Sequence, residues 1–333
     1  MGAGNRSYAA RRVIFFVPKI AIRIRAAICQ TEFGFALPEF GHNVKRAVTA
    51  FMVDRTDPRP GEILLDPACG TGGFLTCSIR HMRERYVKKP EQEKQMQAGL
   101  RAIEKKQLPH MLCVTNMLLH SIEDASFVRH DNGLARPYIS YGQSDRVDIV
   151  LTNPPFGGRE EDGIESNFPK QFQTRETADL YLALIIRLLK PSGRAAVVLP
   201  DGTLFGEGVK TRLKEHLMEE CNLHTIVRLP NSVFKPYASI GTNLLFFEKG
   251  KPTKTIWYWE HRVPEGQKAY SMTKPIRLEH LKDCVGWWGG AKRKGREEGP
   301  RHGKSRPTRS RRRLLEALIA DALAPAATHE EAA

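Results

Sequence analysis

The segment Asn153-Pro154-Pro155-Phe156 places an amide, two prolines and an aromatic ring directly after an apolar run, residues 147–152. The run predicts a buried strand, and the chain must leave the sheet at the prolines because they have no N–H to donate. The amide and the neighbouring carbonyl groups offer hydrogen-bond acceptors, and the ring offers a stacking face. These groups can hold a flat heterocycle by its edge and face, which favours chemistry on the exocyclic amino group of a nucleobase. A proline-rich turn with no such role is the alternative for the tetrapeptide alone.

A second segment, residues 63–74, combines an apolar strand, the acidic Asp66 and a glycine-rich turn. The apolar residues after the turn recur at the spacing of one helix face: Leu75, Ile79, Met82 and Tyr86. Strand, glycine turn and helix form the nucleotide-binding corner of a doubly wound α/β sheet. Glycines there let a ligand approach the backbone, because no Cβ stands in the way.

The glycine turn is neither a full dinucleotide fingerprint nor a P-loop, since no Gly-Lys-Ser/Thr follows it. A pyrophosphate ligand is therefore disfavoured. Asp66 before the glycines suits a ligand with a cationic amino group. S-adenosylmethionine has such a group, together with a sulfonium, a ribose and an adenine.

Together the two segments resemble the motifs of amino-group DNA methyltransferases, in particular the modification subunit of type I restriction–modification systems. The resemblance covers residues 47–294, and its two main motifs stand in the family's order, the cofactor motif first. The matching stretches are residues 66–74, 114–120, 153–158, 199–202 and 240–249.

The resemblance implies a site-specific enzyme that transfers a methyl group from S-adenosylmethionine to the N6 amino group of adenine in double-stranded DNA. It implies these catalytic residues: Asn153, Pro154, Pro155 and Phe156. It implies these cofactor-binding residues: Asp66, Pro67, Ala68, Gly70, Thr71, Gly72, Gly73, Phe74, Glu104 and Asp131. Glu104 stands where a second strand should end, which places it to bind ribose hydroxyls; a solvated surface acid is the alternative. Asp131 begins an Asp-Asn-Gly sequence, which either contacts the adenine or forms an ordinary turn.

The implied partners are a specificity subunit, a second modification subunit and, in a complete system, a restriction subunit. Cytosine-N4 enzymes usually carry Ser and Tyr or Trp where this chain has Asn153 and Phe156, so these two residues favour adenine. A protein-glutamine methyltransferase also uses an Asn-Pro-Pro loop, and the basic balance of this chain favours DNA over that alternative. The implied fold is α/β, a doubly wound, mostly parallel Rossmann-like methyltransferase sheet with an antiparallel edge hairpin.

Composition agrees with a folded protein that has a polyanionic partner. The 333 residues are 41% hydrophobic and carry a net charge of +15, and charge of this sign favours nucleic acid. Residues 291–313 alone hold eleven Lys and Arg against two Glu. The six cysteines and eleven histidines show no metal-ligand spacing and no secretory signal precedes them, so we expect free thiols in a cytoplasmic protein without a metal. No apolar run reaches the length of a membrane span.

Four regions are expected along the chain. Residues 1–40 are predicted to be an atypical, disordered N-terminal segment, 41–290 the methyltransferase domain, 291–313 a solvated basic linker, and 314–333 a short helix and tail. Type I subunits carry a helical domain and a Phe-Tyr-Thr-Pro-Arg motif before the helix that begins at Ala47, whereas residues 39–46 depart from that motif. This departure indicates a truncated or frame-shifted reading frame. It supports an alternative function, a catalytically impaired remnant that binds partner or DNA without turnover.

Periodicity predicts the remaining elements. Helices are expected at 47–53, 110–120 and 178–189, the last buried on nearly all sides and ended by residues 191–193. Strands are expected at 195–199, 226–229 and 243–248, and a polar surface excursion at 88–97. The apolar side of the 110–120 helix is expected to comprise Met111, Leu112, Val114, Met117 and Leu118. A set of five aromatic residues is expected to pack beneath a C-terminal extension, with base stacking as the alternative: Trp257, Tyr258, Trp259, Trp287 and Trp288.

Overall fold

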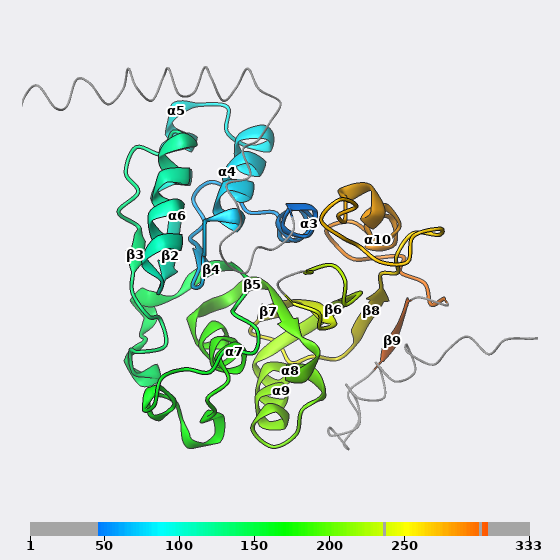
Figure 1. Cartoon of the computed structure of the whole chain (residues 1–333). Helices are drawn as coiled ribbons and strands as arrows, with labels where there is room; N and C mark the ends of the chain where they lie inside the picture. The colour runs from blue at the N-terminus through cyan, green and yellow to red at the C-terminus, as the bar shows by residue number, and fades with distance from the viewer. Residues whose placement is uncertain (1–45, 236–237, 300–301, 306–333) are drawn as a thin grey trace, which may run out of the picture.

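The computed structural model of the chain describes residues 46–235, 238–299 and 302–305. These residues form a nine-stranded sheet with the order β3-β2-β1-β4-β5-β7-β6-β8-β9 (Figure 1). The strands are β1 (Leu64–Asp66), β2 (Leu100–Glu104), β3 (Val128–His130), β4 (Val147–Thr152), β5 (Leu189–Pro200), β6 (Cys221–Leu229), β7 (Thr242–Lys249), β8 (Ile256–Glu260) and β9 (His302–Ser305).

Helices connect most of the strands. The α-helices are α3 (Arg46–Thr56), α4 (Gly73–Arg85), α5 (Pro90–Ala98), α6 (Gln107–Leu119), α7 (Thr177–Leu188), α8 (Asp201–Phe205), α9 (Val209–Glu220) and α10 (Lys282–Trp287). Short 3-10 helices are η1 (Tyr138–Ser140), η2 (Gln143–Asp145), η3 (Ile164–Asn167), η4 (Lys170–Phe172) and η5 (Leu278–Leu281).

The predicted doubly wound, mostly parallel sheet is confirmed. Strands β1 to β5 pair with parallel neighbours, and β7 runs antiparallel to both β5 and β6. The antiparallel β6–β7 pair was expected at the sheet edge, but it lies inside the sheet. The reason is that β8 pairs with β6 and β9 pairs with β8, which moves the edge outward by two strands.

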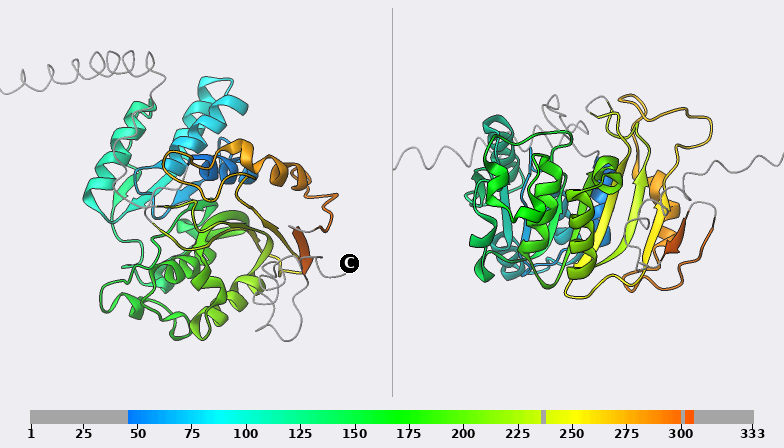
Figure 2. Two further views of the ribbon diagram at one scale, coloured as in Figure 1. Left: turned by 45° about the vertical axis from the view of Figure 1, so that its right-hand side comes forward. Right: turned by 90° about the horizontal axis from the view of Figure 1, so that it is seen from below.

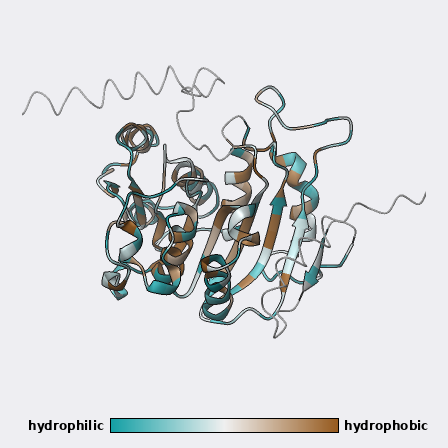
Figure 3. Ribbon diagram, turned by 60° about the horizontal axis from the view of Figure 1, so that its bottom comes forward, coloured by the Kyte–Doolittle hydropathy of each residue, from teal (hydrophilic) through white to brown (hydrophobic). Residues whose placement is uncertain are grey.

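The central strands are apolar along their length because helices cover both faces of the sheet. Along β1, Leu64 packs in the cluster that includes α3, α4 and α6, whereas Leu65 packs in the cluster that includes α7 and α9. Successive strand residues point to opposite faces, so the two clusters alternate along each strand. Figure 2 shows the two groups of helices on opposite sides of the sheet, and Figure 3 shows hydrophobic colour on its central strands.

The helix after the glycine turn is α4, and Leu75, Ile79 and Met82 are buried along it as expected. Residues 88–97 were expected to be a surface excursion, but α5 covers most of that range. Pro90 occupies its first turn, where a missing N–H costs nothing, and Met96 is buried against the sheet side. The polar composition of this range therefore belongs to a largely exposed helix on which Met96 is the buried residue.

The predicted apolar side of α6 is partly wrong. The structure buries Cys113 and Met117 on this helix, while Met111 and Leu118 are 55% and 56% exposed. Leu108 and Leu119 are exposed as well. The helix is apolar nearly all round, so periodicity did not select one face, and the contacts of Cys113 and Met117 with the glycine turn decide the orientation.

The buried helix α7 is confirmed, but it ends at Leu188 instead of at residues 191–193. That Pro-Ser-Gly segment lies within β5, where the register against β4 shifts between Val147 and Ile149. Ser192 has φ of 65°, a left-handed conformation that suits such an irregularity.

The expected packing of the C-terminal aromatic residues is confirmed. Trp288 is buried between Phe51 and Phe246, and the rings of Trp257 and Trp259 contact Trp287. These rings are therefore part of the core and its margin.

The expectation that the basic run is solvated from residue 291 is wrong at Arg296, whereas 291–295 and 297–299 are exposed or partly exposed. Arg296 is buried, its guanidinium lies over the rings of Trp287 and Trp288, and it donates hydrogen bonds to the Trp288 carbonyl at 2.9 Å and to Thr225 Oγ1 at 2.8 Å.

Within the described ranges, no helix has the length and apolar character needed to cross a membrane. The calls on residues 1–40 and 314–333 lie outside the described residues.

Candidate functional site

The sheet brings the two predicted motifs together. Asp66 is the last residue of β1 and Asn153 follows the last residue of β4, and these strands are parallel neighbours with Leu65 opposite Val150. Their carboxyl ends therefore meet at one edge of the sheet. This is the place where the strand order reverses, β2 and β3 lying on one side of β1 and β4 and β5 on the other. Crevices at such points are the usual ligand sites of open α/β sheets.

The Asp66 side chain is buried at the carboxyl end of β1, with 1% of the residue's surface exposed. Burial raises the pKa of Asp66 to about 7, although the Ala68 N–H, which donates a hydrogen bond to Asp66 Oδ1 at 3.2 Å, opposes the rise. The negative charge of Glu104 adds to it. A cation placed beside such a buried carboxyl group favours its ionised form, and the ionised form is a strong hydrogen-bond acceptor.

On one side, the backbone of the glycine turn is not covered by side chains. Gly70 has φ of 54°, and a Cβ added there would meet nothing within 4 Å, so the space beside it is open. Gly72 has φ of 86°, and its Cβ would lie 2.8 Å from Cys113 Sγ, so this glycine lets α6 pack against the turn. Asn116 on α6 donates a hydrogen bond to the Thr71 carbonyl at 2.8 Å. The turn is therefore fixed from the helix side and open on the other.

Glu104 ends β2, as expected, and is buried. Its carboxylate accepts hydrogen bonds from the Gly70 N–H and the Lys106 N–H, both at 2.8 Å. Each oxygen keeps a second lone pair, so the group can fix the turn and still accept a hydrogen bond from a hydroxyl. The alternative of a solvated surface acid is wrong.

Asp131 lies at the end of β3, and its N–H donates to the Glu104 carbonyl at 3.1 Å. Its carboxylate is 52% exposed and pairs with Arg129 at 2.9 Å. The next residue, Asn132, makes a turn by accepting a hydrogen bond from the Leu134 N–H at 3.0 Å. The structure thus brings Asp131 beside the cofactor turn and also gives the Asp-Asn-Gly sequence ordinary turn chemistry.

The remaining turn residues differ in placement. Pro67, Ala68, Thr71 and Gly73 lie in the turn or at the start of α4, whereas Phe74 is 3% exposed and packs in the core below the sheet edge. The Phe74 ring therefore belongs to the hydrophobic core.

Asn153 and Pro154 are buried at the end of β4, while Pro155 and Phe156 are partly exposed. The Phe156 ring meets the Phe234 ring edge-to-face, with centroids 5.9 Å apart. Gly157 follows with φ of 64°, which turns the chain back toward the molecule. The Asn153 amide is thus buried, and the Phe156 ring lies partly exposed beside Phe234.

Two clusters escaped the sequence analysis. Asp201, from the 199–202 stretch, forms an ion pair with Arg228 at 2.8 Å and accepts a hydrogen bond from Asn243 at 2.8 Å. This links the end of β5, the end of β6 and the start of β7. Glu160 is buried just beyond Phe156. Asp201 and Asn243 lie in the matching stretches 199–202 and 240–249, but the pattern gave neither a role. Glu160 lies in none of these stretches and its partners are distant in sequence, so no local pattern marks it.

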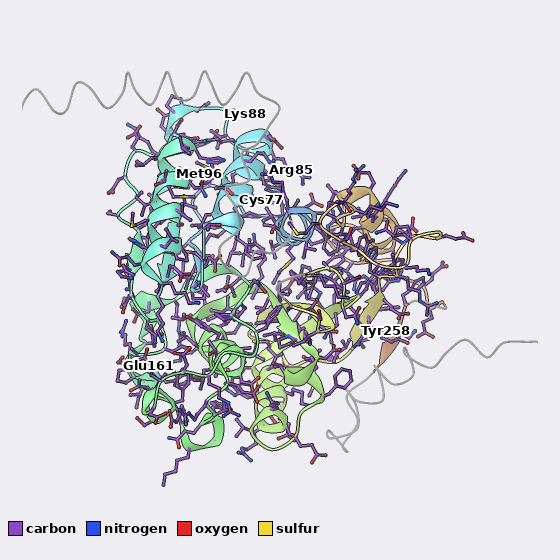
Figure 4. The ribbon with its side chains drawn as sticks, viewed as in Figure 1. Cys77, Arg85, Lys88, Met96, Glu161 and Tyr258 are labelled. Atoms are coloured by element: carbon purple, nitrogen blue, oxygen red, sulfur yellow. The ribbon has the colours of Figure 1, made fainter. Side chains whose placement is uncertain are left out.

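A cavity of about 420 Å³ lies elsewhere, between α3, α4 and α10, and none of the predicted site residues lines it. Cys77 and Arg85, labelled in Figure 4, belong to its wall. Arg85 pairs with Asp54 at 2.5 Å across it. The described part of the chain holds no group of three His, Cys, Asp or Glu residues arranged for a metal ion.

Comparison with known proteins agrees with this geometry. Residues 44–303 match the family described as N-6 DNA Methylase. The chain is 61% identical over 244 residues to the methylase subunit of the type I restriction enzyme EcoEI of Escherichia coli, a match that covers 73% of this chain and 49% of that protein. It is 33% identical to the EcoKI methylase subunit of Escherichia coli strain K12, covering 67% and 44%.

Among solved structures, the chain is similar to one from Vibrio vulnificus YJ016 that its description assigns to a type I restriction enzyme as a modification subunit. The TM-score is 0.76 and the identity is 42%, over 91% of this chain and 61% of that one. The chain spans about half the length of the curated relatives it matches.

Proposed function

Because this chain belongs to the N-6 DNA methylase family, we propose that it transfers a methyl group from S-adenosylmethionine to the N6 of adenine in DNA, as the modification subunit of a type I restriction–modification complex. The observation that carries the proposal is the meeting of Asp66 and Asn153 at the adjacent carboxyl ends of β1 and β4. A donor site and an acceptor site on neighbouring strand ends suit a direct transfer between two bound groups.

On the donor side, the open space beside Gly70 and the buried carboxylates of Asp66 and Glu104 fit S-adenosylmethionine. When bound, this cofactor supplies an electrophilic methyl group on a sulfonium. Asp66 would pair with its amino group, and Glu104 and Asp131 would accept hydrogen bonds from its ribose and adenine. The turn residues Pro67, Ala68, Thr71, Gly72 and Gly73 complete the proposed cofactor site, with Phe74 packed in the core.

On the acceptor side, Asn153 Oδ1 and the Pro154 carbonyl would accept the two amino hydrogens of adenine. The nitrogen lone pair is then less delocalised into the ring and is available for in-line attack. The base must leave the duplex to enter such a site, and the Phe156 ring would stack on it. Pro155 fixes the loop backbone between these groups.

The test is methyl transfer to double-stranded DNA by the chain together with a matched specificity subunit, mapped by sequencing for N6-methyladenine. Asn153→Ala removes one acceptor and should lower the rate by roughly two to three orders of magnitude. Its calorimetric affinity for S-adenosylmethionine should match that of the parent. An unchanged transfer rate in Asn153→Ala would contradict the assigned role.

The same experiment separates the proposal from its alternative, the impaired remnant that residues 39–46 suggested; those residues lie almost wholly outside the described part. A remnant would bind DNA or its partner with normal affinity and give no N6-methyladenine under any condition.

We further propose a cytoplasmic complex with a specificity subunit, a second modification subunit and a restriction subunit. The methyltransferase domain is proposed for residues 41–290, and the burial of Arg296 favours a boundary somewhat later.

A further inference from the structure

Glu160 is a buried carboxylate four residues beyond Phe156, and the proposed chemistry does not use it. It is 7% exposed. One oxygen accepts a hydrogen bond from Thr177 Oγ1 at 3.0 Å. The other accepts from Asn132 Nδ2 at 3.3 Å and pairs with Lys105 Nζ at 3.2 Å. The charge is thus held by partners from three different parts of the chain.

These partners come from the loops that surround the proposed site. Lys105 follows Glu104 at the end of β2, Asn132 follows Asp131 at the end of β3, and Thr177 begins α7. Glu160 itself belongs to the loop that leaves β4. In the sheet order, β2 and β3 lie on one side of β1 and β4 lies on the other. The Glu160 carboxylate therefore joins the cofactor side of the site to the base side.

Backbone hydrogen bonds also hold the loop after β4 against the start of α7. The Thr177 N–H donates to the Gly158 carbonyl at 3.1 Å, and the Glu160 N–H donates to the Arg175 carbonyl at 2.9 Å. A Cβ on Gly158 would come within 3.1 Å of Thr177 Oγ1, so the packing is close. Backbone contacts alone would close this loop. A buried charge carries a desolvation cost, which its contacts toward Lys105 and Asn132 must offset.

We infer that Glu160 is a positioning residue that couples occupation of the cofactor site to the geometry of the Asn153–Phe156 loop. The inference rests on the proposed function. A ligand that fixes the loops after β2 and β3 also fixes Lys105 and Asn132, and through them Glu160 and the loop after β4. Coupling between sites is reciprocal, so adenine in its pocket strengthens cofactor binding by the same factor.

Hydrogen exchange of the full-length chain with and without S-adenosylhomocysteine tests this. In the parent, the ligand should slow amide exchange both in the turn 66–74 and in the loop 157–163. The slowing in the loop should be about fivefold or more, the usual size of coupling between sites. Glu160→Ala should keep the slowing at 66–74 and lose it at 157–163. Glu160→Gln should lose part of it, because it retains an acceptor for Thr177 and gives up the ion pair with Lys105.

Glu161→Gln is the matched control. Glu161 also pairs with Lys105, at 3.0 Å, but it is 76% exposed (Figure 4), and its replacement should leave both responses at the parental level. Thermal unfolding identifies a variant that fails to fold; in that case Lys105→Met, which leaves Glu160 in place, provides the same comparison.

The outcomes are distinct. If Glu160→Ala and Glu160→Gln both keep the parental slowing at 157–163, the coupling is refuted and the proposed function stands. If the parent itself shows neither slowing nor calorimetric binding of the ligand, the proposed function fails and this inference fails with it.

Discussion

Asp66 shows at the scale of one residue how burial and function are connected. Its carboxyl group titrates near neutrality because it is buried, and the proposed partner is a cation. The folded-state pKa is above the value in the unfolded chain, so the group contributes stability that is complete below the unfolded pKa near 3.8. That contribution is lost as the pH rises toward 7, because the native state must then hold a buried charge.

This gives a prediction for cofactor binding. The amino group of S-adenosylmethionine should bind the ionised form of Asp66, so affinity should be about fivefold weaker at pH 6 than at pH 7. Calorimetry in two buffers of different ionisation enthalpy should show proton release on binding between these values. Asp66→Asn should bind weakly at both and remove the difference. An equal affinity for the parent at pH 6 and pH 7 would show that Asp66 does not face the cation.

The sequence predicted Asp66 and Asn153 as site residues because each follows a short apolar run. Such a run is visible in consecutive residues, without knowledge of the fold. Glu160 could not be found in this way. Its partners are 55, 28 and 17 residues away along the chain, and only the sheet order brings them together. Arg296 escaped for a related reason, since a charge run gives no sign that indole rings lie beneath one of its members.

At the scale of elements, the glycine turn and α6 constrain each other through Gly72. The left-handed conformation and the 2.8 Å approach to Cys113 Sγ both exclude a side chain there. The hydrogen bond between Cys69 and Cys113, together with burial, raises the pKa of the Cys69 thiol well above its ordinary value, so Cys69 should react slowly with thiol reagents in the folded protein. The helix orientation that periodicity could not predict follows from this contact.

Gly72→Ala should therefore lower the free energy of unfolding by about 2 kcal/mol or more, the sum of left-handed strain and overlap with Cys113. Adding Cys113→Ala should recover part of the loss, because the overlapping sulfur is gone. Urea unfolding followed by circular dichroism measures both. Gly70→Ala is the control: its Cβ meets no atom within 4 Å, so only the strain of about 1 kcal/mol should appear. Equal losses at the two glycines would mean that α6 does not limit the turn.

At the scale of the whole molecule, the C-terminal strands extend the sheet and fasten its edge through Arg296. Burial lowers the pKa of this guanidinium to about 10, and the charge of Arg293 adds to the effect. Cation–π contacts with two indole rings and two directed hydrogen bonds accommodate the arginine there, while its Nη2 is buried without a hydrogen-bond partner.

Arg296→Ala should cost about 2 to 4 kcal/mol of stability, since it removes hydrogen bonds from a charged group and the stacking on Trp287 and Trp288. Arg296→Lys should recover little, because an ammonium group lacks the planar fork. Arg293→Ala is the comparison: its ion pair with Glu248 is partly exposed, and its loss should cost at most about 1 kcal/mol. Denaturant unfolding of the full chain decides between them, and similar losses for both variants would show that the edge is fastened elsewhere.

The strand order also fixes when the proposed chemistry first becomes possible during synthesis. β1, β2 and β3 leave the ribosome before β4 and are neighbours in the sheet, so with α4, α5 and α6 they can pack as an early half-sheet. β4 arrives later and pairs on the opposite side of β1. The place where the ends of β1 and β4 meet, with Asp66 and Asn153, thus joins a part made early to a part made late. A nascent chain holds its glycine turn at an open sheet edge until β4 and the loop after it have emerged.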